Sequence, residues 1–393
     1  MESRYFNRDL TEAGEATRSI HGGTSPDLVT GAILPPIYQT ATYAQEGVGI
    51  NKGHTYSRSS NPTVKSLELR LAAIEGSNCF ATCFATGMAA MSTLLMTLMK
   101  KDEHLICSDV LFGGSVRFID SILSKYGITA SYVDAADPEN VAKAIRPNTK
   151  LIFLETPANP TLKLNDIEAI SKIAKKNNLP LVVDNTFMSS LQKPFDLGAD
   201  IILYSTTKYI DGHNSTVGGA LLTTNQQLAT DFEYTRKNLG NIQAPFEAWL
   251  ILQGLKTLVL RVKQHSDNAL QVAKYLKNHP KVSSVIYPGL DDFPQLELAK
   301  KQHPSGYHGG MLVFEMVEGY DKAISVMNKV KLCALAESLG STESLITHPA
   351  SMTHAAMTRE AREAIGLSEG MIRLSVGLED VADIIKDLEQ AMS

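Results

Sequence analysis

The chain has 393 residues, of which 44% are hydrophobic and 20% charged, as is ordinary for a globular protein. A formal net charge of −5 gives no electrostatic basis for binding nucleic acid or an anionic membrane, so we expect neither partner. No apolar run is long enough to cross a bilayer, and the first 18 residues are not signal-like. Four cysteines, mostly in apolar runs, predict small core residues in a reducing compartment, hence a cytoplasmic protein, and no metal site.

The N-terminal quarter begins with an irregular segment. Residues 1–20 are charged and lack apolar periodicity, which predicts a mobile arm, and residues 21–43 are rich in Gly, Pro and Thr, which predicts extended chain. Asn61-Pro62 then breaks the chain, and apolar residues at helical spacing predict a helix that begins at Thr63. Taken alone, Arg58 is interpreted as a solvated loop arginine.

A small-residue turn precedes the next predicted helix, residues 88–99. The run F-A-T-G-M-A-A places Gly87 and Met88 at the start of that helix. Backbone N–H groups at a helix start, together with the helix dipole, favour an anion. A tight turn that packs small residues beneath a helix is the structural alternative, and both interpretations can hold together.

Two further strands are expected before the centre of the chain. Residues 104–110 read as a strand, and Phe112 follows it in a glycine-containing loop, with Arg117 five residues further on. Residues 150–160, K-L-I-F-L-E-T-P-A-N-P, read as a buried strand followed by a proline-bounded loop that contains Asn159. Asparagine also favours turns, so Asn159 alone does not indicate a ligand.

Residues 179–208 form the stretch around which the chain is organised. Short apolar runs at 181–183 and 201–204 read as buried parallel strands, the first ending at Asp184 and the second running on to Lys208. Ligands of open α/β sheets bind in the crevice beyond the carboxyl ends of the strands, so we expect both side chains to point into one crevice. The structural alternative is an aspartate that caps a turn and a surface lysine.

This pairing suits pyridoxal phosphate (PLP). PLP needs a lysine amine for a Schiff base and a carboxylate that keeps its ring nitrogen protonated. Ser205 and Thr207 flank the lysine with hydroxyls that can reach a phosphate. Asp184 and Lys208 by themselves therefore indicate either a PLP site or the turn-capping aspartate and surface lysine of the structural alternative.

The C-terminal part alternates helices and short strands. A helical pattern at residues 245–260 marks the predicted domain boundary, and a helix at 266–279 is followed by strands at 282–287 and 310–316, an α+β layer. Arg373 lies within an otherwise apolar strand, which is expensive for a charge without a partner. An amino-acid α-carboxylate would supply a bidentate partner, and a structural salt bridge is the alternative.

Several blocks of this sequence resemble the PLP-dependent enzymes of cysteine and methionine metabolism. S-T-T-K-Y-I-D-G-H is similar to the cofactor-lysine motif of that family, and the likeness runs from about His21 to about Glu389. The resemblance implies a fold-type I α/β architecture, in which a large, mostly parallel sheet with helices on both faces precedes a smaller C-terminal α+β domain. It also implies an arm over residues 1–55 that reaches a neighbouring subunit, a PLP-binding domain over 56–245 and a substrate-binding domain over 246–393.

The resemblance implies roles for individual residues. Lys208, Tyr56 and Asp184 are expected to be catalytic, and the expected cofactor contacts are Lys208, Tyr56, Arg58, Gly87, Met88, Phe112, Asn159, Asp184, Thr186, Ser205 and Thr207. Tyr56 and Arg58 match the pair that reaches the adjacent subunit's site and binds the cofactor phosphate there, for which a guanidinium fork is well suited. This match implies shared-site dimers and a tetramer built from two of them. The expected substrate contacts are Arg373, Ser338, Glu337 and Arg117, and His348 and His354 are expected to be structural.

The choice among relatives depends on a few positions. Most members carry tyrosine where this chain has Phe112, which can stack on the cofactor but cannot act as an acid or base, as in some O-acylhomoserine sulfhydrylases. Glu337 is typical of enzymes that process cystathionine, whereas methionine γ-lyases have a small apolar residue there and a cysteine in place of Gly114. Ser60, however, matches the methionine γ-lyases.

The expected function is that of a transsulfuration enzyme of cysteine and methionine biosynthesis. It would catalyse γ-elimination or γ-replacement on cystathionine or an O-acylhomoserine, and cysteine is a further expected small-molecule partner. A methionine γ-lyase, a cystathionine β-lyase, an O-succinylhomoserine sulfhydrylase and a non-catalytic binding protein with the same fold remain alternatives.

Overall fold

The computed structural model describes residues 10–393 apart from residues 77, 354, 356 and 357. The chain divides into two compact units, and each unit combines two separate stretches of sequence. Unit 1 comprises Met1–Lys100 and Asp200–Val259, and unit 2 comprises Lys101–Ala199 and Leu260–Ser393. The domain boundaries expected after residues 55 and 245 stay predictions.

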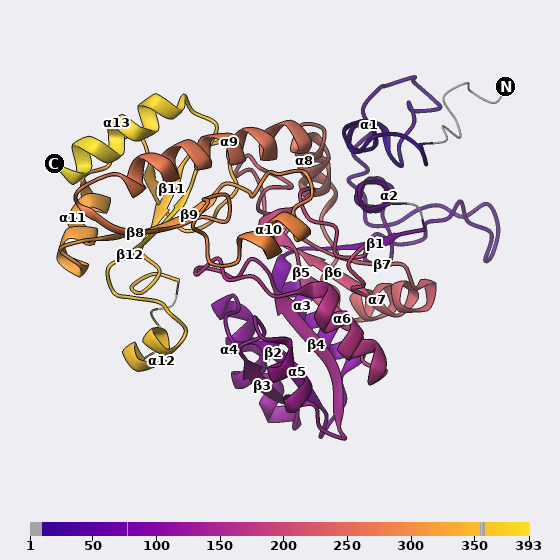
Figure 1. The fold of residues 1–393 in the computed structure, drawn as a ribbon. Helices are drawn as coiled ribbons and strands as arrows, with labels where there is room; N and C mark the ends of the chain where they lie inside the picture. Colours follow the sequence, from indigo (N-terminus) through magenta and orange to yellow (C-terminus); the bar gives the residue numbers. More distant parts are fainter. Residues whose placement is uncertain (1–9, 77, 354, 356–357) are drawn as a thin grey trace. The chain divides into compact units, whose positions relative to one another are not determined.

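Unit 1 contains a three-stranded antiparallel run with helices around it (Figure 1). The strand β7 (Gly219–Thr223) pairs with β1 (Phe80–Phe84) on one side and with β6 (Ile201–Tyr204) on the other. The helices of this unit are α1 (Glu15–His21), α2 (Pro62–Glu75), α3 (Gly87–Leu98), α7 (Gln226–Leu239) and α8 (Pro245–Leu255).

Side-chain caps explain where two of these helices begin. The Asn61 carboxamide oxygen accepts the backbone N–H groups of Thr63 and Val64, with Pro62 at the first helical position of α2. The Thr86 hydroxyl accepts the N–H of Ala89 at the start of α3. Both predicted helix starts are confirmed to within one residue.

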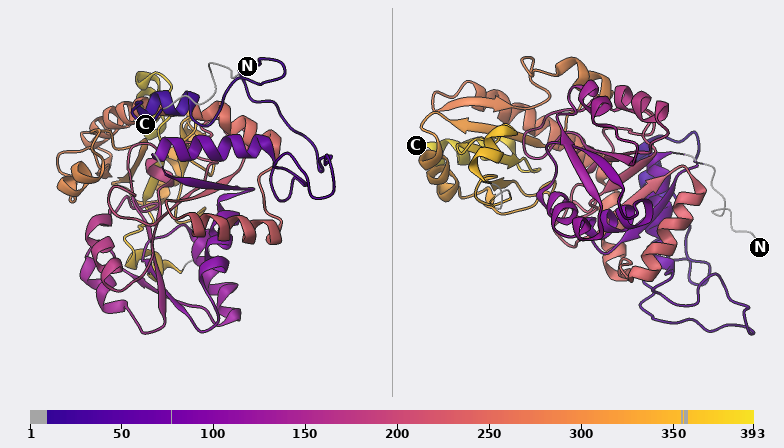
Figure 2. Two further views of the ribbon diagram at one scale, coloured as in Figure 1. Left: turned by 90° about the vertical axis from the view of Figure 1, so that its right-hand side faces the viewer. Right: turned by 90° about the horizontal axis from the view of Figure 1, so that it is seen from below.

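The N-terminal segment corrects one expectation. Residues 1–9 lie outside the described part of the chain, but α1 forms within the stretch where only a mobile arm was expected, and it packs against α2. A seven-residue helix without an apolar stripe depends on tertiary packing rather than on its own propensity, so periodicity did not reveal it. Residues 22–43 form no helix or strand, as expected (Figure 2). Part of this segment is bonded to helices, since the Tyr38 N–H donates to the Thr63 hydroxyl of α2 and the Trp249 indole of α8 donates to the Pro35 carbonyl.

Unit 2 carries a parallel run of four strands in the order β5-β4-β2-β3. These strands are β2 (His104–Ser108), β3 (Thr129–Val133), β4 (Thr149–Glu155) and β5 (Leu181–Asp184). The connecting helices are α4 (Gly113–Ser121), α5 (Pro138–Ala144) and α6 (Ile167–Lys176), with 3-10 turns η1 (Leu123–Tyr126) and η2 (Thr186–Met188). Apolar side chains of β2, β4 and β5 form one core with those of α5 and α6, which fixes the polar strand ends in place.

The C-terminal part of unit 2 is a second sheet in the order β10-β11-β12-β9-β8. Its strands are β8 (Val282–Ile286), β9 (Met311–Met316), β10 (Ala334–Leu335), β11 (Leu345–Thr347) and β12 (Met371–Ser375). The helices that follow or flank them are α9 (Leu258–Lys277), α10 (Leu296–Gln302), α11 (Tyr320–Lys329), α12 (Arg359–Ala364) and α13 (Val381–Met392). Side chains of α9, α11 and α13 bury the apolar residues of this sheet. Figure 1 shows these three helices beside its strands.

The helices at the predicted boundary differ from the expectation. The pattern at residues 245–260 covers α8 and the start of α9, which are separated at Lys256 and Thr257, and α9 begins eight residues before position 266. The backbone N–H groups of Lys256 and Thr257 bond to the carbonyls three residues before them, a tight 3-10 ending of α8. Apolar spacing alone could not show this break, because the pattern continues through it.

Two sequence expectations concern the burial of the cysteines and the lack of a membrane-spanning segment. All four cysteines are free thiols, and three are buried as expected, whereas Cys79 is partly exposed. None of the helices in the described part of the chain has the length and apolar character required to span a bilayer.

Candidate active site

The helix start predicted to bind an anion is assembled within unit 1. The first N–H groups of α3, those of Gly87 and Met88, have no acceptor inside the helix. A Cβ added at Gly87 would lie 3.0 Å from Ser205 Cβ and 3.2 Å from its hydroxyl oxygen. The absence of a side chain at Gly87 therefore allows Ser205 to lie close to the start of α3. Backbone N–H groups at a helix N-terminus fit a phosphate.

Lys208 lies on a tight turn directly after β6. Its backbone N–H donates to the Ser205 carbonyl at 3.3 Å, and its carbonyl accepts from Gly212 at 2.8 Å. The Thr207 hydroxyl donates to the Gly218 carbonyl and accepts the Gly218 N–H, at 3.2 and 3.0 Å. Thr207 thus ties the lysine turn to the chain before β7.

Tyr56 and Arg58 lie at the surface of unit 1. Tyr56 is 44% exposed, and the Arg58 guanidinium lies over the Tyr56 ring at 5.5 Å from its centre. The Arg58 side chain also donates to the carbonyl of Lys237 at 2.8 Å. The single chain therefore presents this pair outward.

Two carboxyl groups end adjacent strands in unit 2. Asp184 ends β5 and Glu155 ends β4, and the two are direct partners in the parallel register. Burial raises the pKa of Asp184 to about 6, although hydrogen bonds from Thr186 lower it. Burial and then the Asp184 charge raise the pKa of Glu155 well above its usual value, against its two amide donors and Arg373.

Phe112 is held by its backbone and packs on a glycine. Its N–H donates to Glu155 Oε2 at 2.7 Å, while its side chain is 41% exposed. A Cβ added at Gly114 would lie 2.4 Å from a carbon of the Phe112 ring. The ring position observed here therefore requires glycine at position 114.

Arg373 is 2% exposed in β12, between β9 and β11. Its guanidinium donates to Asn159 Oδ1 at 2.9 Å, to the Ser338 carbonyl at 2.9 Å and to the Thr347 hydroxyl at 3.1 Å. Ser338 itself adopts a positive φ of 94°. Three neutral oxygens thus hold the guanidinium fork in one orientation.

The two other predicted substrate residues lie at the surface, and one of the two predicted structural histidines is hydrogen-bonded on both ring nitrogens. Glu337 lies exposed after β10, and Arg117 lies exposed on α4. The His348 ring bonds to the Ser351 hydroxyl and to the Glu369 carbonyl, at 2.7 and 2.8 Å, as a structural histidine does. His354 lies outside the described residues.

The geometry adds one residue that sequence reasoning did not assign. Unit 1 brings together Gly87, Met88 and Ser205, whereas Asp184, Phe112, Asn159, Ser338 and Arg373 lie in unit 2. Glu155 joins the second set because its oxygens accept from the backbones of Phe112 and Asn159. Its signal in the sequence is the charge that ends the apolar run K-L-I-F-L-E.

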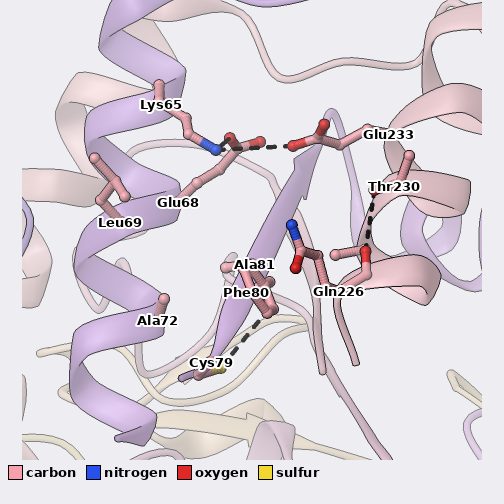
Figure 3. A pocket seen from close by; sticks show the side chains of 11 residues that line it. Lys65, Glu68, Leu69, Ala72, Cys79, Phe80, Ala81, Gln226, Thr230 and Glu233 are labelled. Atoms are coloured by element: carbon pink, nitrogen blue, oxygen red, sulfur yellow. Dashed lines mark hydrogen bonds and ion pairs between the residues drawn. The ribbon is translucent and has the colours of Figure 1, made fainter. Parts of the chain in front are cut away.

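A separate pocket of about 200 Å³ lies in unit 1 between α2, β1 and α7. Figure 3 shows Lys65 and Glu68 from α2 and Glu233 from α7 at this pocket, with Lys65 Nζ 3.6 and 3.7 Å from the two carboxylates. No predicted site residue lines it. Among the described residues, no group of three or more His, Cys, Asp or Glu side chains is arranged to hold a metal ion.

Comparison with known proteins adds independent information. The profile of the Cys/Met metabolism PLP-dependent enzymes matches residues 16–393. A cystathionine γ-synthase of Mycobacterium tuberculosis is 45% identical over 382 residues, which are 97% of either chain. A cystathionine β-lyase of Coxiella burnetii is 43% identical over 380 residues, 96% of this chain and 97% of that protein.

A solved structure agrees with these matches. The cystathionine γ-lyase of Lactobacillus plantarum, complexed with L-serine, superposes with a TM-score of 0.92 and 41% identity, over 96% of this chain and 98% of the other. The expected α/β fold with a large, mostly parallel sheet and a smaller C-terminal sheet is confirmed. The chain therefore belongs to the Cys/Met metabolism PLP-dependent enzyme family, and its cofactor is PLP.

Proposed function

We propose that this enzyme is a transsulfuration enzyme that catalyses γ-elimination or γ-replacement on cystathionine or an O-acylhomoserine. The observation that carries the proposal is the orientation of Arg373, whose guanidinium is fixed by Asn159, Ser338 and Thr347. A fork held in this way suits an amino-acid α-carboxylate. Glu337, exposed on the same unit, is available for the ammonium of a distal amino-acid arm.

The residues present fit PLP. The N–H groups of Gly87 and Met88, with the Ser205 hydroxyl beside them, would hold the phosphate, because a helix N-terminus favours an anion. Asp184 would face the ring nitrogen and hold the proton on it, while Phe112 would stack on the ring and Asn159 would contact its phenolic oxygen. Thr186 supports the Asp184 carboxylate through its backbone N–H, at 3.0 Å.

PLP, when bound, supplies the electron sink that allows a proton to leave the substrate α-carbon. The Lys208 amine would take that proton and carry it onward, as a general base on a short turn after β6. Arg373 would hold the α-carboxylate so that the bond to be broken is oriented for reaction. Tyr56 would assist proton transfer, since Phe112 has no hydroxyl to do so.

We also propose a shared-site dimer, two of which form a tetramer. Tyr56 and Arg58 are presented at the surface, and the preceding segment exposes several large apolar side chains, Leu28, Val29, Ile33, Val48 and Ile50. Exposed apolar chain of this extent favours burial against another subunit. Thr207 remains a proposed ligand of the cofactor phosphate, and Arg117 remains a proposed ligand of a distal substrate carboxylate. The proposed compartment is the cytoplasm.

Reaction with L-cystathionine tests the reaction type. Release of 2-oxobutyrate would establish γ-elimination, whereas release of pyruvate would establish β-elimination and contradict the proposal. If neither keto acid forms, O-succinylhomoserine and O-acetylhomoserine are supplied with cysteine, and formation of cystathionine would establish γ-replacement. Failure of all these reactions in protein that shows the visible absorption of bound PLP would overturn the proposal.

A sulfhydrylase is a second candidate because of Phe112. An O-acylhomoserine with sulfide in place of cysteine would then yield homocysteine. The different-class alternative, a binding protein without catalysis, predicts no turnover and no loss of function when Lys208 is replaced by alanine. The four residues Lys208, Asp184, Arg58 and Arg373 favour an enzyme, since binding alone does not require a lysine, an acid and two arginines together.

A further inference from the structure

Glu155 holds two loops of the candidate site together. It ends β4 with a side chain that is 5% exposed. Oxygen Oε2 accepts the Phe112 N–H at 2.7 Å, and oxygen Oε1 accepts the Asn159 N–H at 3.1 Å. Phe112 follows β2 and Asn159 follows β4, so one carboxyl group connects two loops that the sheet alone does not join.

The same carboxyl group lies beside the proposed partner of the ring nitrogen. Glu155 and Asp184 are opposite each other in adjacent parallel strands, which directs both side chains to one face of the sheet. The pKa of Glu155 is raised well above its usual value, by burial first and by the Asp184 charge next, while Arg373 acts in the opposite sense. The charges of Asp184 and Arg373 therefore act on the Glu155 carboxyl group in opposite senses.

A third connection runs from Asn159 to the proposed carboxylate clamp. The Asn159 backbone is held by Glu155, and its side-chain oxygen accepts from Arg373 Nη1 at 2.9 Å. Asn159 is itself buried. A displacement of the Asn159 loop would therefore be transmitted to the orientation of the Arg373 guanidinium.

We infer that Glu155 is a positioning residue, which sets Phe112 and Asn159 in place beside Asp184 and couples the stacking of the cofactor ring to the orientation of Arg373. This inference rests on the proposed function. Glu155 need not touch the substrate, because it acts through the backbone of the two loops. Loss of the Glu155 carboxyl group is expected to change the orientation of the cofactor ring and that of the Arg373 guanidinium together.

Glu68 provides a matched control. It is buried to a similar degree, and its Oε1 accepts the Cys83 N–H at 3.1 Å and the Arg236 guanidinium at 2.5 Å. All three residues lie in unit 1, and none is a proposed ligand of the cofactor or substrate. A purely structural role for buried glutamate is thus represented in the same chain.

The test compares Glu155→Gln and Glu68→Gln with the unaltered enzyme, each reconstituted with PLP. Glutamine keeps the shape of glutamate, but its NH₂ group cannot accept a hydrogen bond, so one of the two loop amides loses its acceptor. The visible circular dichroism per bound PLP reports the orientation of the cofactor ring. A spectral titration with glycine, which has an α-carboxylate and no side chain, reports the carboxylate clamp.

We expect Glu155→Gln to lower the visible circular dichroism and to weaken PLP and glycine binding by roughly tenfold or more each, because one of the two loop amides is left without its acceptor. Glu68→Gln should change the thermal midpoint alone. Normal circular dichroism and glycine affinity in folded Glu155→Gln would overturn the inference, whatever its stability. If that variant does not fold, Glu155→Asp decides by the same readouts, because its shorter side chain cannot reach both amides.

Failure of the inference is separable from failure of the proposed function. Unaltered enzyme that binds PLP and converts cystathionine or an O-acylhomoserine supports the proposed function. This holds even if Glu155→Gln gives the same results as the unaltered enzyme in both spectral assays. Unaltered enzyme without these activities contradicts the proposed function. The Glu155 assays measure cofactor orientation and glycine binding and need no turnover.

Discussion

Asp184 is expected to destabilise the PLP-free protein above about pH 6. Burial raises its pKa from the usual 3.8 to about 6, so between these values the folded carboxyl is protonated while the unfolded one is ionised. Stability contributed by the protonated form is therefore lost as the pH rises through the folded pKa. One pKa unit corresponds to about 1.4 kcal/mol, which makes the loss about 3 kcal/mol.

Asp184→Asn removes this titration and keeps the shape of the side chain. Its Oδ1 can still accept the Thr186 N–H that Asp184 accepts at 3.0 Å. We expect PLP-free Asp184→Asn to gain stability over the unaltered protein as the pH rises from about 4 to about 7, by about 3 kcal/mol in total. With PLP bound, the same variant should have lower activity, since asparagine cannot hold the ring nitrogen protonated. The site would thus trade stability for function.

Urea unfolding of the PLP-free proteins at a series of pH values measures the difference, at one protein concentration because the protein is a proposed oligomer. Asp387→Asn is the control of opposite sign. Burial opposes ionisation of Asp387, but the N–H groups of Lys331, Leu332 and Cys333 outweigh it and lower the pKa of that carboxyl. The stability that the ionised Asp387 carboxyl group contributes is present at neutral pH and lost as the pH falls. A stability difference for Asp184→Asn that does not change with pH would refute the reasoning.

Three further predictions concern the site. Arg373→Lys keeps the charge but loses the guanidinium fork, so KM for an amino-acid substrate should rise roughly ten- to a hundredfold with a smaller change in kcat. An unchanged KM in steady-state kinetics would contradict the proposed binding of the substrate carboxylate by Arg373. Gly114→Ala places a Cβ 2.4 Å from the Phe112 ring, so the ring must move and the visible circular dichroism of bound PLP should change; an unaltered spectrum would show that the ring is free to adapt. Arg58→Ala and Lys208→Ala should each be inactive alone, yet mixed oligomers should regain activity if Arg58 serves the neighbouring site, and a mixture that stays inactive after subunit exchange would argue against shared sites.

Local rules in the sequence determined much of the framework. Asn61-Pro62 and Thr86 mark helix starts because capping depends on residues two or three positions apart. The apolar runs that end at Asp184 and before Lys208 mark buried strands, and both strands are present at the expected residues. The family blocks extend this local reading to the cofactor, because its motifs are contiguous stretches of sequence.

Long-range contacts decided the rest. Glu155 meets Phe112 across 43 sequence positions, and Arg373 meets Asn159 across 214, separations at which no spacing rule applies. The need for glycine at position 114 likewise depends on where the Phe112 ring comes to rest. The pKa of Asp184 depends on its burial, and the short helix α1 depends on packing against α2. Sequence patterns determine which groups end a strand or begin a helix, whereas desolvation, charge coupling and steric exclusion exist only once the folded chain brings distant residues together.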